Sequence, residues 1–269
     1  MIKKIIYKLF IIFFILFFIL IISLSTFGIE TNRFNNLISK NIEKIKNIKL
    51  QLKTIKFKID PKDISLFLET KQPIINFKNI IIPSQNIKVY IDFLSLIKTE
   101  PNIKKINIIL TELDINQLNE LSKFIKPSNF KSFVNNNITD AQLKAEIEIF
   151  LNKEGNIDNY ILRGDVKNIE ANLLNGIRLL KTKFNFFADK EDILIKKFFG
   201  KIENIKINDG DLKLNFNNGI KLNSNFNTQV NLRDKNLDKF KNILEKFDFT
   251  KRIKNVSGEF NNNISLNFI

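Results

Sequence analysis

The sequence contains no cysteine, no histidine and no tryptophan. Without cysteine the chain can form no disulfide, no thiolate zinc site and no thiol nucleophile. Without histidine it lacks the Ser-His-Asp and Cys-His catalytic arrangements, histidine-ligated metals and the commonest general base. An enzyme built from this chain would have to rely on carboxylates, lysine, serine or tyrosine.

Glycine is also scarce, with eight residues scattered singly, so the sequence offers no glycine-rich phosphate loop. The paired carboxylates lie in turn-like stretches, where aspartate is favoured for its own hydrogen bonds. Their spacing does not match a calcium loop. We therefore expect no metal, no cofactor and no enzymatic activity. These carboxylates are Asp60, Asp63, Glu191, Asp192, Asp209 and Asp211.

The chain is basic, with 43 Lys and Arg against 28 Asp and Glu and a net charge of +15. Such a charge suits nucleic acid or an anionic membrane surface. Lys, Asn, Ile and Phe are enriched together, however, which an AT-rich coding sequence produces whatever the function. Attraction to acidic headgroups would contribute about 1 kcal/mol per basic residue near the surface. We expect membrane lipids as partners and no nucleic acid.

One long apolar run, from Leu9 to Ile29, carries no charged side chain. As a helix it would span about 30 Å, the thickness of the hydrocarbon core of a bilayer. Lysines precede the run and Glu30 follows it, which predicts a cytoplasmic N-terminus and a single-pass anchor. A cleaved signal peptide is the alternative, but its apolar region would be only about 7 to 15 residues long. The anchor residues are Leu9, Phe13, Phe17, Ile21 and Phe27.

The periodicity predicts three parts: a cytoplasmic tip and anchor over 1–29, a membrane-proximal α+β part over 30–136, and an antiparallel β-meander over 137–269. In the middle part, helical spacing over 31–48 and 116–126 alternates with short strands, with a bulge near Lys53 and Thr54. The stretch 127–137 is rich in Asn and Ser, and we interpret it as a loop and the softest internal boundary.

From Thr139 onward apolar and polar residues alternate cleanly, as in strands with one wet face. Two turn signals, over 208–211 and 217–219, separate further strands. A helical period returns over 237–247, and a last strand begins at Val256. No closing turn follows that strand, so we expect the sequence to be truncated at its C-terminus. The predicted fold is mainly β with a few short helices, and an N-terminal transmembrane helix precedes the meander.

The apolar side of such a meander must be covered. Two packed sheets would hide it in an ordinary sandwich. The alternative is a sheet curled into an extended hydrophobic groove whose lining contacts ligand chains. The residues that we expect to line this groove are Leu143, Ala145, Ile147, Ile149, Leu151, Leu212, Leu214, Phe216, Leu222 and Phe226.

The chain resembles the AsmA-like superfamily of bacterial envelope proteins, of the YhdP and TamB type. The resemblance rests on the anchor running into GIETNRFNNLI (28–38), on the segment 52–97, and on the strand-Gly-strand pattern in LRGDVKNIEANL (162–173) and NVSGEFNNNISLNF (255–268). It covers essentially the whole chain but involves architecture rather than a catalytic motif. The chain departs from the family in being much shorter than members that span a periplasm, so the resemblance implies a bridge only if this is an N-terminal portion of a longer member, or if several copies or partners complete it.

The resemblance implies a bacterial inner-membrane protein with its body in the periplasm and a hydrophobic β-groove of the bridge-like lipid-transfer kind. The expected function is to hold or conduct phospholipid acyl chains for outer-membrane lipid homeostasis and envelope assembly. One alternative is a scaffold or assembly factor whose strand edges pair with outer-membrane proteins. Another is a single-anchor subunit of a lipopolysaccharide bridge. Partners besides lipid would then be envelope or outer-membrane proteins.

Overall fold

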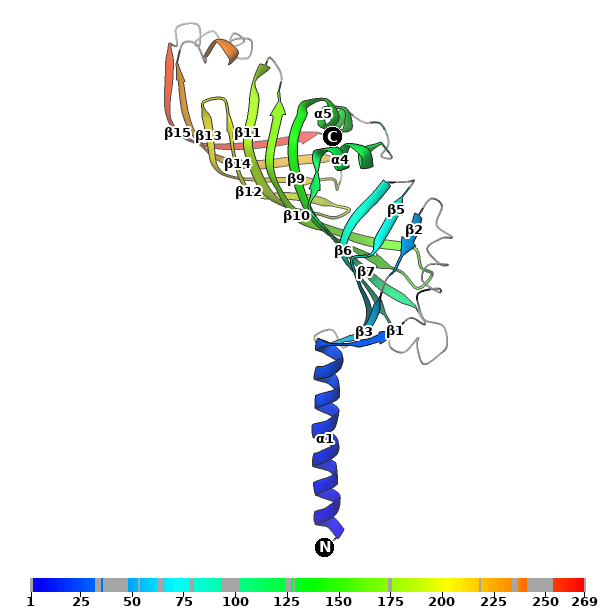
Figure 1. The fold of residues 1–269 in the computed structure, drawn as a ribbon. Helices are drawn as coiled ribbons and strands as arrows, with labels where there is room; N and C mark the ends of the chain where they lie inside the picture. The colour runs from blue at the N-terminus through cyan, green and yellow to red at the C-terminus, as the bar shows by residue number, and fades with distance from the viewer. Residues whose placement is uncertain are drawn as a thin grey trace. The chain divides into compact units, whose positions relative to one another are not determined.

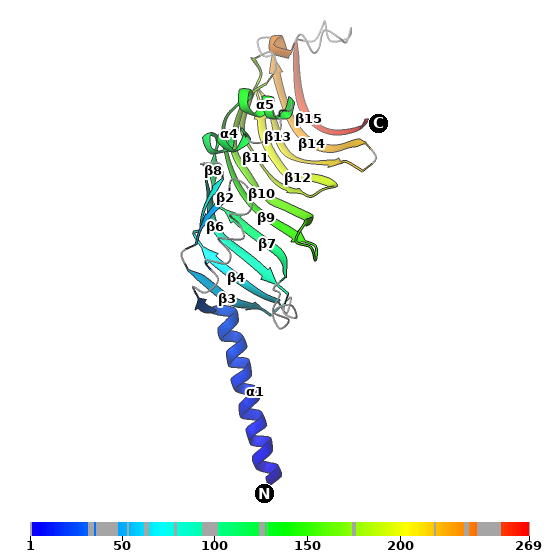
Figure 2. The same ribbon diagram turned by 90° about the vertical axis from the view of Figure 1, so that its right-hand side faces the viewer.

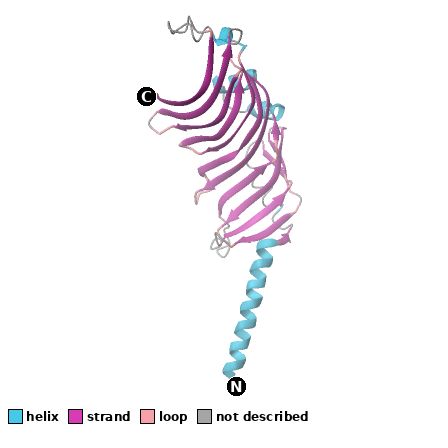
Figure 3. Ribbon diagram, turned by 90° about the vertical axis from the view of Figure 1, so that its left-hand side faces the viewer, coloured by secondary structure: helices cyan, strands magenta, loops and turns pink. Residues whose placement is uncertain are grey.

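The computed structural model describes residues 2–31, 35, 48–52, 54–61, 65–77, 80–92, 102–123, 127, 129–173, 176–217, 219–233, 237–240 and 254–268. These residues form an N-terminal helix, a long series of antiparallel strands and a few short helices (Figure 1, Figure 3). This confirms the predicted fold class. The sheet is open and uncurled, which differs from the expected curling into a groove.

The chain divides into two compact units, which are described separately. Unit 1 comprises 1–110 and 147–160, and unit 2 comprises 111–146 and 161–269. The unit 1 elements are α1 (Ile2–Thr26), β1 (Ile29–Thr31), β2 (Ile48–Gln51), β3 (Ile55–Asp60), β4 (Ser65–Lys71), β5 (Ile74–Phe77), β6 (Ile80–Ile91) and β7 (Ile103–Leu110).

Helix α1 contains the predicted anchor, and its segment Ile5–Thr26 is long and apolar enough to cross a membrane. Its anchor side chains Leu9, Phe13 and Phe17 are exposed. An apolar surface all around a helix is typical of a segment that faces lipid. The helix ends before Gly28, whose φ of +69° is the left-handed conformation that commonly terminates helices. Phe27, predicted as part of the anchor, lies just beyond the helix.

Unit 1 contains two sheets that share the long strand β6. One sheet has the order β1-β3-β4-β6-β7, and the other pairs β2 with β5 and β5 with the first half of β6. The core between them is dry: Ile55 is 1% exposed and Ile91 is 7% exposed. Leu52 and Val89 contact the buried side chains of both halves of this core. Unit 1 therefore has a buried apolar core of its own, although Ile74, Ile81 and Ile103 stay exposed.

The predicted bulge near Lys53 and Thr54 is instead a break between strands of the two sheets. β2 pairs with β5, whereas β3 pairs with β4. The change of alternation in the sequence is therefore real, but it marks a transfer from one sheet to the other. The helix expected over 31–48 falls almost entirely outside the described residues.

A buried ion pair lies on the opposite side of the main sheet of unit 1. Lys58 Nζ is 2.7 Å from Glu69 Oε2, and both side chains are largely buried. The Asn86 amide donates to the other oxygen of Glu69 at 2.7 Å. Burial raises the pKa of Glu69, but the Lys58 ammonium, the Asn86 amide and the nearby Lys88 outweigh it and hold this pKa below its usual value.

Unit 2 begins with β8, α4 and α5 and continues as a meander. Its elements are β8 (Leu113–Asp114), α4 (Ile115–Ser122), α5 (Asn129–Asn137), β9 (Ile138–Leu151, shared with unit 1), β10 (Ile157–Asn172, whose first residues belong to unit 1), β11 (Arg178–Ala188), β12 (Asp192–Ile202), β13 (Ile205–Asn215), β14 (Ile220–Arg233), the 3₁₀ turn η2 (Asp238–Phe240) and β15 (Asn255–Phe268). From β10 to β15 each strand pairs antiparallel with the next.

Two helical expectations in unit 2 have different outcomes. Helix α4 is confirmed, and Asp114 caps it by accepting from Gln117 N while the Gln117 side chain accepts from Asp114 N. The prediction of a loop over 127–137 is wrong for most of the stretch, because α5 begins at Asn129 and runs to Asn137. Phe130 and Val134 are four residues apart there, so the Asn-rich sequence conceals a helical apolar spacing. Beyond η2, the helix expected over 237–247 lies outside the described residues.

Strand β13 runs continuously through the Asn208–Asp211 segment, which the sequence predicted as a turn between two strands. Instead Asn208 is a bulge: Ile207 lies opposite Thr228 and Asp209 opposite Asn227. Comparable register shifts mark β10, β11 and β12, at residues with positive φ: Asn168 at 54°, Lys181 at 50° and Lys197 at 53°. Bulges bend strands and increase their twist. The strands of unit 2 accordingly curve along their length (Figure 2).

Candidate functional site

The bulges keep the apolar side chains of unit 2 on one face. In β13 the apolar positions are odd at Ile205 and Ile207 but even at Leu212 and Leu214. Without an extra residue at Asn208, the two halves of the strand would point to opposite faces. The extra residue at the bulge brings the apolar side chains of both halves of the strand to the same face. The other bulged strands show the same change from odd to even, or even to odd, apolar positions. The sequence and the bulges together therefore place most apolar side chains of unit 2 on one uncharged face.

We define the apolar face of unit 2 by the cross-strand pairs on the Leu214 side of the sheet. Leu214 lies opposite Leu222 and Ile193, and Leu222 lies opposite Leu266. No charged side chain occurs among its members. From β10 to β15 these are Leu162, Gly164, Val166, Ile169, Ala171, Leu179, Thr182, Phe184, Phe186, Ala188, Ile193, Ile195, Phe198, Gly200, Ile202, Ile205, Ile207, Gly210, Leu212, Leu214, Ile220, Leu222, Ser224, Phe226, Thr228, Val230, Leu232, Val256, Gly258, Phe260, Asn262, Ile264 and Leu266.

The opposite face is polar throughout β14 and β15. Every residue that alternates with the apolar set there is Asn, Gln, Ser, Lys, Arg or Glu. A sheet with one apolar and one wet side normally packs the apolar side against a second layer. The apolar face of unit 2 is therefore the candidate functional surface.

The apolar face is far more accessible than the core of unit 1. Ile264 and Leu266 are each 45% exposed, Phe260 is 42% exposed and Ile220 is 46% exposed. Toward β9 and β10 the face is better covered, since Ala141, Ala145 and Ile169 are buried. The most exposed apolar side chains of the face thus lie on β15 and at Ile220 of β14, whereas Ile207 of β13 and Leu232 of β14 are buried.

Three phenylalanine rings form an aromatic row across this face. Phe184 of β11 stacks on Phe198 of β12 with ring centroids 5.7 Å apart, and Phe198 meets Phe226 of β14 edge-on at 5.6 Å. Phe226 lies directly over Gly210, where a Cβ would come within 2.2 Å of the ring. The glycine therefore gives the Phe226 ring its space.

The predicted lining residues fall into three groups. Leu212, Leu214, Leu222 and Phe226 share the apolar face of unit 2, and Leu143 and Ala145 lie in the unit 2 part of β9. Ile147, Ile149 and Leu151 belong to unit 1. Phe216 lies in the turn after β13 and is 41% exposed.

The prediction of lining residues missed several residues that the structure places on the same face. These are Phe184 and Phe198 of the aromatic row, Gly210, and the exposed Phe260, Ile264 and Leu266 of β15. The alternation in 256–268 could have identified the β15 residues. No sequence signal places Gly210 beneath Phe226, because that contact depends on the pairing of β13 with β14.

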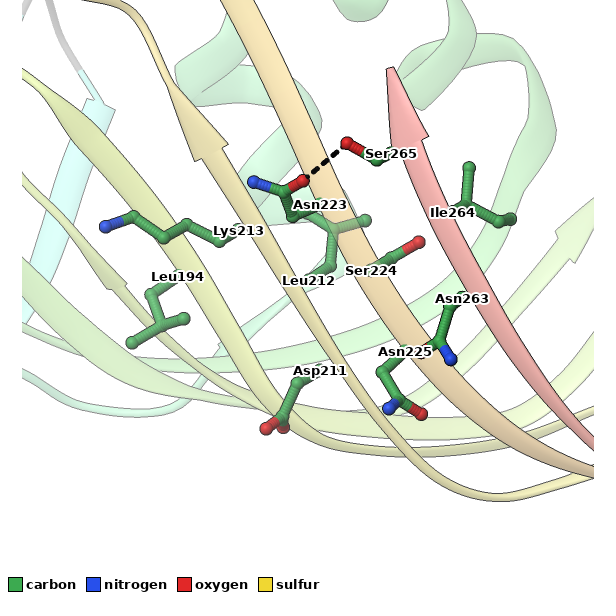
Figure 4. Close-up of a pocket in the computed structure, with 10 residues that line it drawn as sticks. All are labelled: Leu194, Asp211, Leu212, Lys213, Asn223, Ser224, Asn225, Asn263, Ile264 and Ser265. Atoms are coloured by element: carbon green, nitrogen blue, oxygen red, sulfur yellow. Dashed lines mark hydrogen bonds between the residues drawn. The ribbon is translucent and has the colours of Figure 1, made fainter. Parts of the chain in front are cut away.

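A shallow depression of about 390 Å³ is lined by residues of β12 to β15 (Figure 4). Most of its lining side chains belong to the polar face, and Asn223 accepts from Ser265 Oγ at 2.9 Å there. Its two charged groups have partners: Lys213 Nζ lies 2.9 Å from Asp192 Oδ2, and Asp211 accepts from Lys197 N. The Lys213 ammonium, with the Asn215 amide, holds the pKa of Asp192 below its usual value. These charges stabilise hairpins and leave no reactive group.

Of the carboxylates predicted to lie in turns, Glu191, Asp192, Asp209 and Asp211 bond to groups on the same or neighbouring strands and turns, and Asp63 lies outside the described residues. Asp209 accepts from Gly210 N beside the bulge, and Asp189 caps the turn before β12 by accepting from Glu191 N and Asp192 N. Among the described residues there is no group of three or more Asp, Glu, His or Cys that could hold a metal ion. The main feature of the described surface is the set of exposed apolar side chains on the apolar face of unit 2.

No protein-family model, no curated protein and no solved structure matches this chain. The functional argument therefore rests on the geometry of the two faces and on helix α1.

The close contact at Gly210 gives a first testable prediction. Gly210→Ala should lower the free energy of unfolding by about 1–3 kcal/mol, because the added methyl would overlap the Phe226 ring and force the aromatic row to shift. Adding Phe226→Ala should remove the clash, so the double variant should lose less than the sum of the two single losses. Urea denaturation followed by circular dichroism measures all three values. Additive losses would mean that Gly210 and Phe226 do not interact.

Proposed function

We propose that this protein is an inner-membrane-anchored envelope protein of AsmA-like type. In this proposal the apolar face of unit 2 holds phospholipid acyl chains, in the service of outer-membrane lipid homeostasis and envelope assembly. The observation that carries it is the uncharged face of the sheet, whose large apolar side chains on β15 and at Ile220 of β14 are up to about half exposed. Water-exposed apolar area on this scale usually marks a binding surface.

The chemistry of the face favours a long apolar chain over a compact polar ligand. Its few polar side chains are engaged within the sheet: Thr182 Oγ1 donates to Leu180 O, and Asn262 Nδ2 donates to Thr228 Oγ1 at 2.9 Å. Burying one methylene group is worth about 0.8 kcal/mol. An acyl chain lying across several strands would therefore bind without any dedicated polar site, while its headgroup stays in water.

Helix α1 supports the same proposal, since a membrane-spanning segment would keep the protein next to a source of lipid. The lysines at 3, 4 and 8 and the Glu30 that follows the helix favour a cytoplasmic N-terminus. Under this orientation the strands of both units lie on the periplasmic side of a bacterial inner membrane.

The orientation can be tested with a single cysteine, because the natural chain has none. Gly155→Cys, in an exposed turn, should react with a membrane-impermeant maleimide in intact spheroplasts. A cysteine placed before α1, as in Lys3→Cys, should react only after the membrane is opened. The reverse pattern would contradict the proposed orientation.

Contact with acyl chains can be tested with a single tryptophan, because the natural chain has none. We expect the fluorescence of Leu222→Trp, in the full chain reconstituted with phospholipid brominated on its acyl chains, to be strongly quenched. Asn223→Trp is the matched control, since the next residue along β14 points to the polar face. Equal quenching at both positions would mean that the body merely lies on the bilayer, and no quenching at either would refute acyl-chain binding.

A further inference from the structure

The shallow depression on the polar face of unit 2 has no role in the proposed lipid function. Strands β12, β13, β14 and β15 all contribute to it (Figure 4), and its volume is about 390 Å³. Sites for small ligands and short chain segments occupy about 300–1,000 Å³. The depression is therefore large enough to hold part of a ligand, and its side chains indicate which kind.

One row of side chains crosses the polar face at this depression. Phe187 of β11 lies opposite Leu194 of β12, which lies opposite Lys213 of β13. Lys213 lies opposite Asn223 of β14, and Asn223 lies opposite Ser265 of β15. Neighbouring strands are about 4.8 Å apart, so a chain laid along this row meets a new side chain at each such step. The row is apolar at its β11 end and polar at its β15 end.

A pair of amides beside the row has free hydrogen-bonding groups. Asn225 of β14 lies opposite Asn263 of β15, and both side chains are exposed. Among the described residues neither amide has a hydrogen-bond partner, and Figure 4 shows both pointing to the same side of their strands. Each carboxamide offers two donors and an acceptor oxygen. The pair can therefore bind a ligand that both donates and accepts hydrogen bonds.

The charges at the depression disfavour an anionic ligand. The Lys213 ammonium lies 2.9 Å from Asp192 Oδ2 and is already neutralised. Asp211, which accepts from Lys197 N at 3.3 Å, keeps an exposed carboxylate there. A phosphate or a carboxylate would be repelled by Asp211, whereas a hydroxyl group can donate to it. An uncharged ligand with hydroxyl groups suits this surface best.

A glycan chain has the complementary chemistry. Its rings carry hydroxyl groups at their rims, which bond to carboxamides and carboxylates, and C–H groups on their faces, which pack on aromatic and apolar side chains. Phe187 is 36% exposed, and with Leu194 it supplies an apolar platform on the same face as the amides. The rings of an extended β-1,4-linked chain follow one another at nearly the spacing of the strands. Successive rings can therefore rest on successive strands.

We propose that the polar face of unit 2 binds an uncharged, extended glycan chain that lies across β11 to β15. One ring rests on Phe187 and Leu194, and the rings farther along bond to the amides of Asn225 and Asn263. The proposal does not depend on the proposed lipid function, because the two ligands would occupy opposite faces of the sheet.

The test uses the hexasaccharide of β-1,4-linked N-acetylglucosamine, titrated calorimetrically into the full chain in a detergent without a sugar headgroup. Asn225→Ala with Asn263→Ala should weaken binding about tenfold or more, because both free amides are removed. The matched control is Asn231→Ala with Asn255→Ala, which removes two exposed amides from the same face of the same strands, at least about 20 Å away. The control should bind as the wild type does. No binding by the wild type, or equal losses in the two variants, would overturn the proposal.

The apolar platform is tested at Phe187. Phe187→Ala should also weaken binding of the hexasaccharide about tenfold, whereas Phe187→Tyr keeps the ring and should bind as the wild type does. Leu222→Asp changes only the opposite face and should leave this affinity unchanged, so the glycan and lipid proposals can fail separately. Circular dichroism verifies the fold of each variant. Wild-type affinity in Phe187→Ala, or a loss of affinity in a folded Leu222→Asp variant, would contradict the proposed site.

Discussion

Leu222→Asp is expected to reduce contact between lipid and the apolar face at least tenfold. Leu222 lies opposite Leu214 on β13 and Leu266 on β15, at the centre of the exposed apolar area. A carboxylate there would have to lose its water whenever an acyl chain covered it, and an unpaired buried charge is strongly unfavourable. The readout is bromolipid quenching of a tryptophan at position 214, directly across from the substitution.

The same variant distinguishes a binding face from a core. Leu222 is only half-buried, so an aspartate at this position should change the free energy of unfolding by about 1 kcal/mol. Asn223→Asp adds the same charge to the polar face and should leave both quenching and stability unchanged. Loss of the folded state in Leu222→Asp would contradict the proposal, because it would identify the face as the core of a sandwich.

Lys58→Met is expected to lower the free energy of unfolding by about 3–5 kcal/mol at neutral pH. The substitution keeps the apolar stem but leaves the Glu69 carboxylate buried without its ammonium partner. Lys56→Met is the matched control: Lys56 pairs with Glu30 at 3.2 Å, but Glu30 is 64% exposed. An exposed pair of this kind contributes about 0–1 kcal/mol. Equal losses in the two variants would show that the Glu69 pair is not desolvated.

The pH dependence of the Lys58→Met effect follows from the direction of the Glu69 pKa. The pKa of Glu69 in the folded protein lies below the ordinary 4.5, so the ionised carboxylate stabilises the folded state above that pH. This contribution is lost as the pH falls through the folded pKa, where Glu69 becomes protonated. The difference between wild type and Lys58→Met should therefore shrink below pH 4.5, whereas a constant difference would exclude the ion pair as its cause.

The sequence predicted those parts of the fold that depend on local alternation. An apolar run of bilayer length becomes α1, and alternating residues after Thr139 become strands with one apolar face. Leu212, Leu214, Leu222 and Phe226 could be assigned to one face because each lies in a short stretch with a strict period of two. Such patterns follow from the pleat of a strand and need no knowledge of its neighbours.

The parts that were missed depend on pairing between strands. Asn-Asp-Gly is a strong turn signal in isolation, yet pairing with β12 and β14 holds Asn208 to Gly210 inside one strand as a bulge. The burial of Lys58 beside Glu69 likewise depends on the register of β3 with β4. The sequence alone also does not decide between a covered and an open apolar face, since both have the same alternation.

The central claim is that acyl chains lie on the apolar face of unit 2. Its most direct test is a photoreactive residue at Leu214 in the full chain, irradiated in native membranes and analysed by mass spectrometry. The account predicts a phospholipid adduct attached at position 214 and none at the neighbouring Lys213, whose side chain lies on the polar face beside Asp192. Absence of lipid from position 214, or equal labelling of 213 and 214, would contradict it.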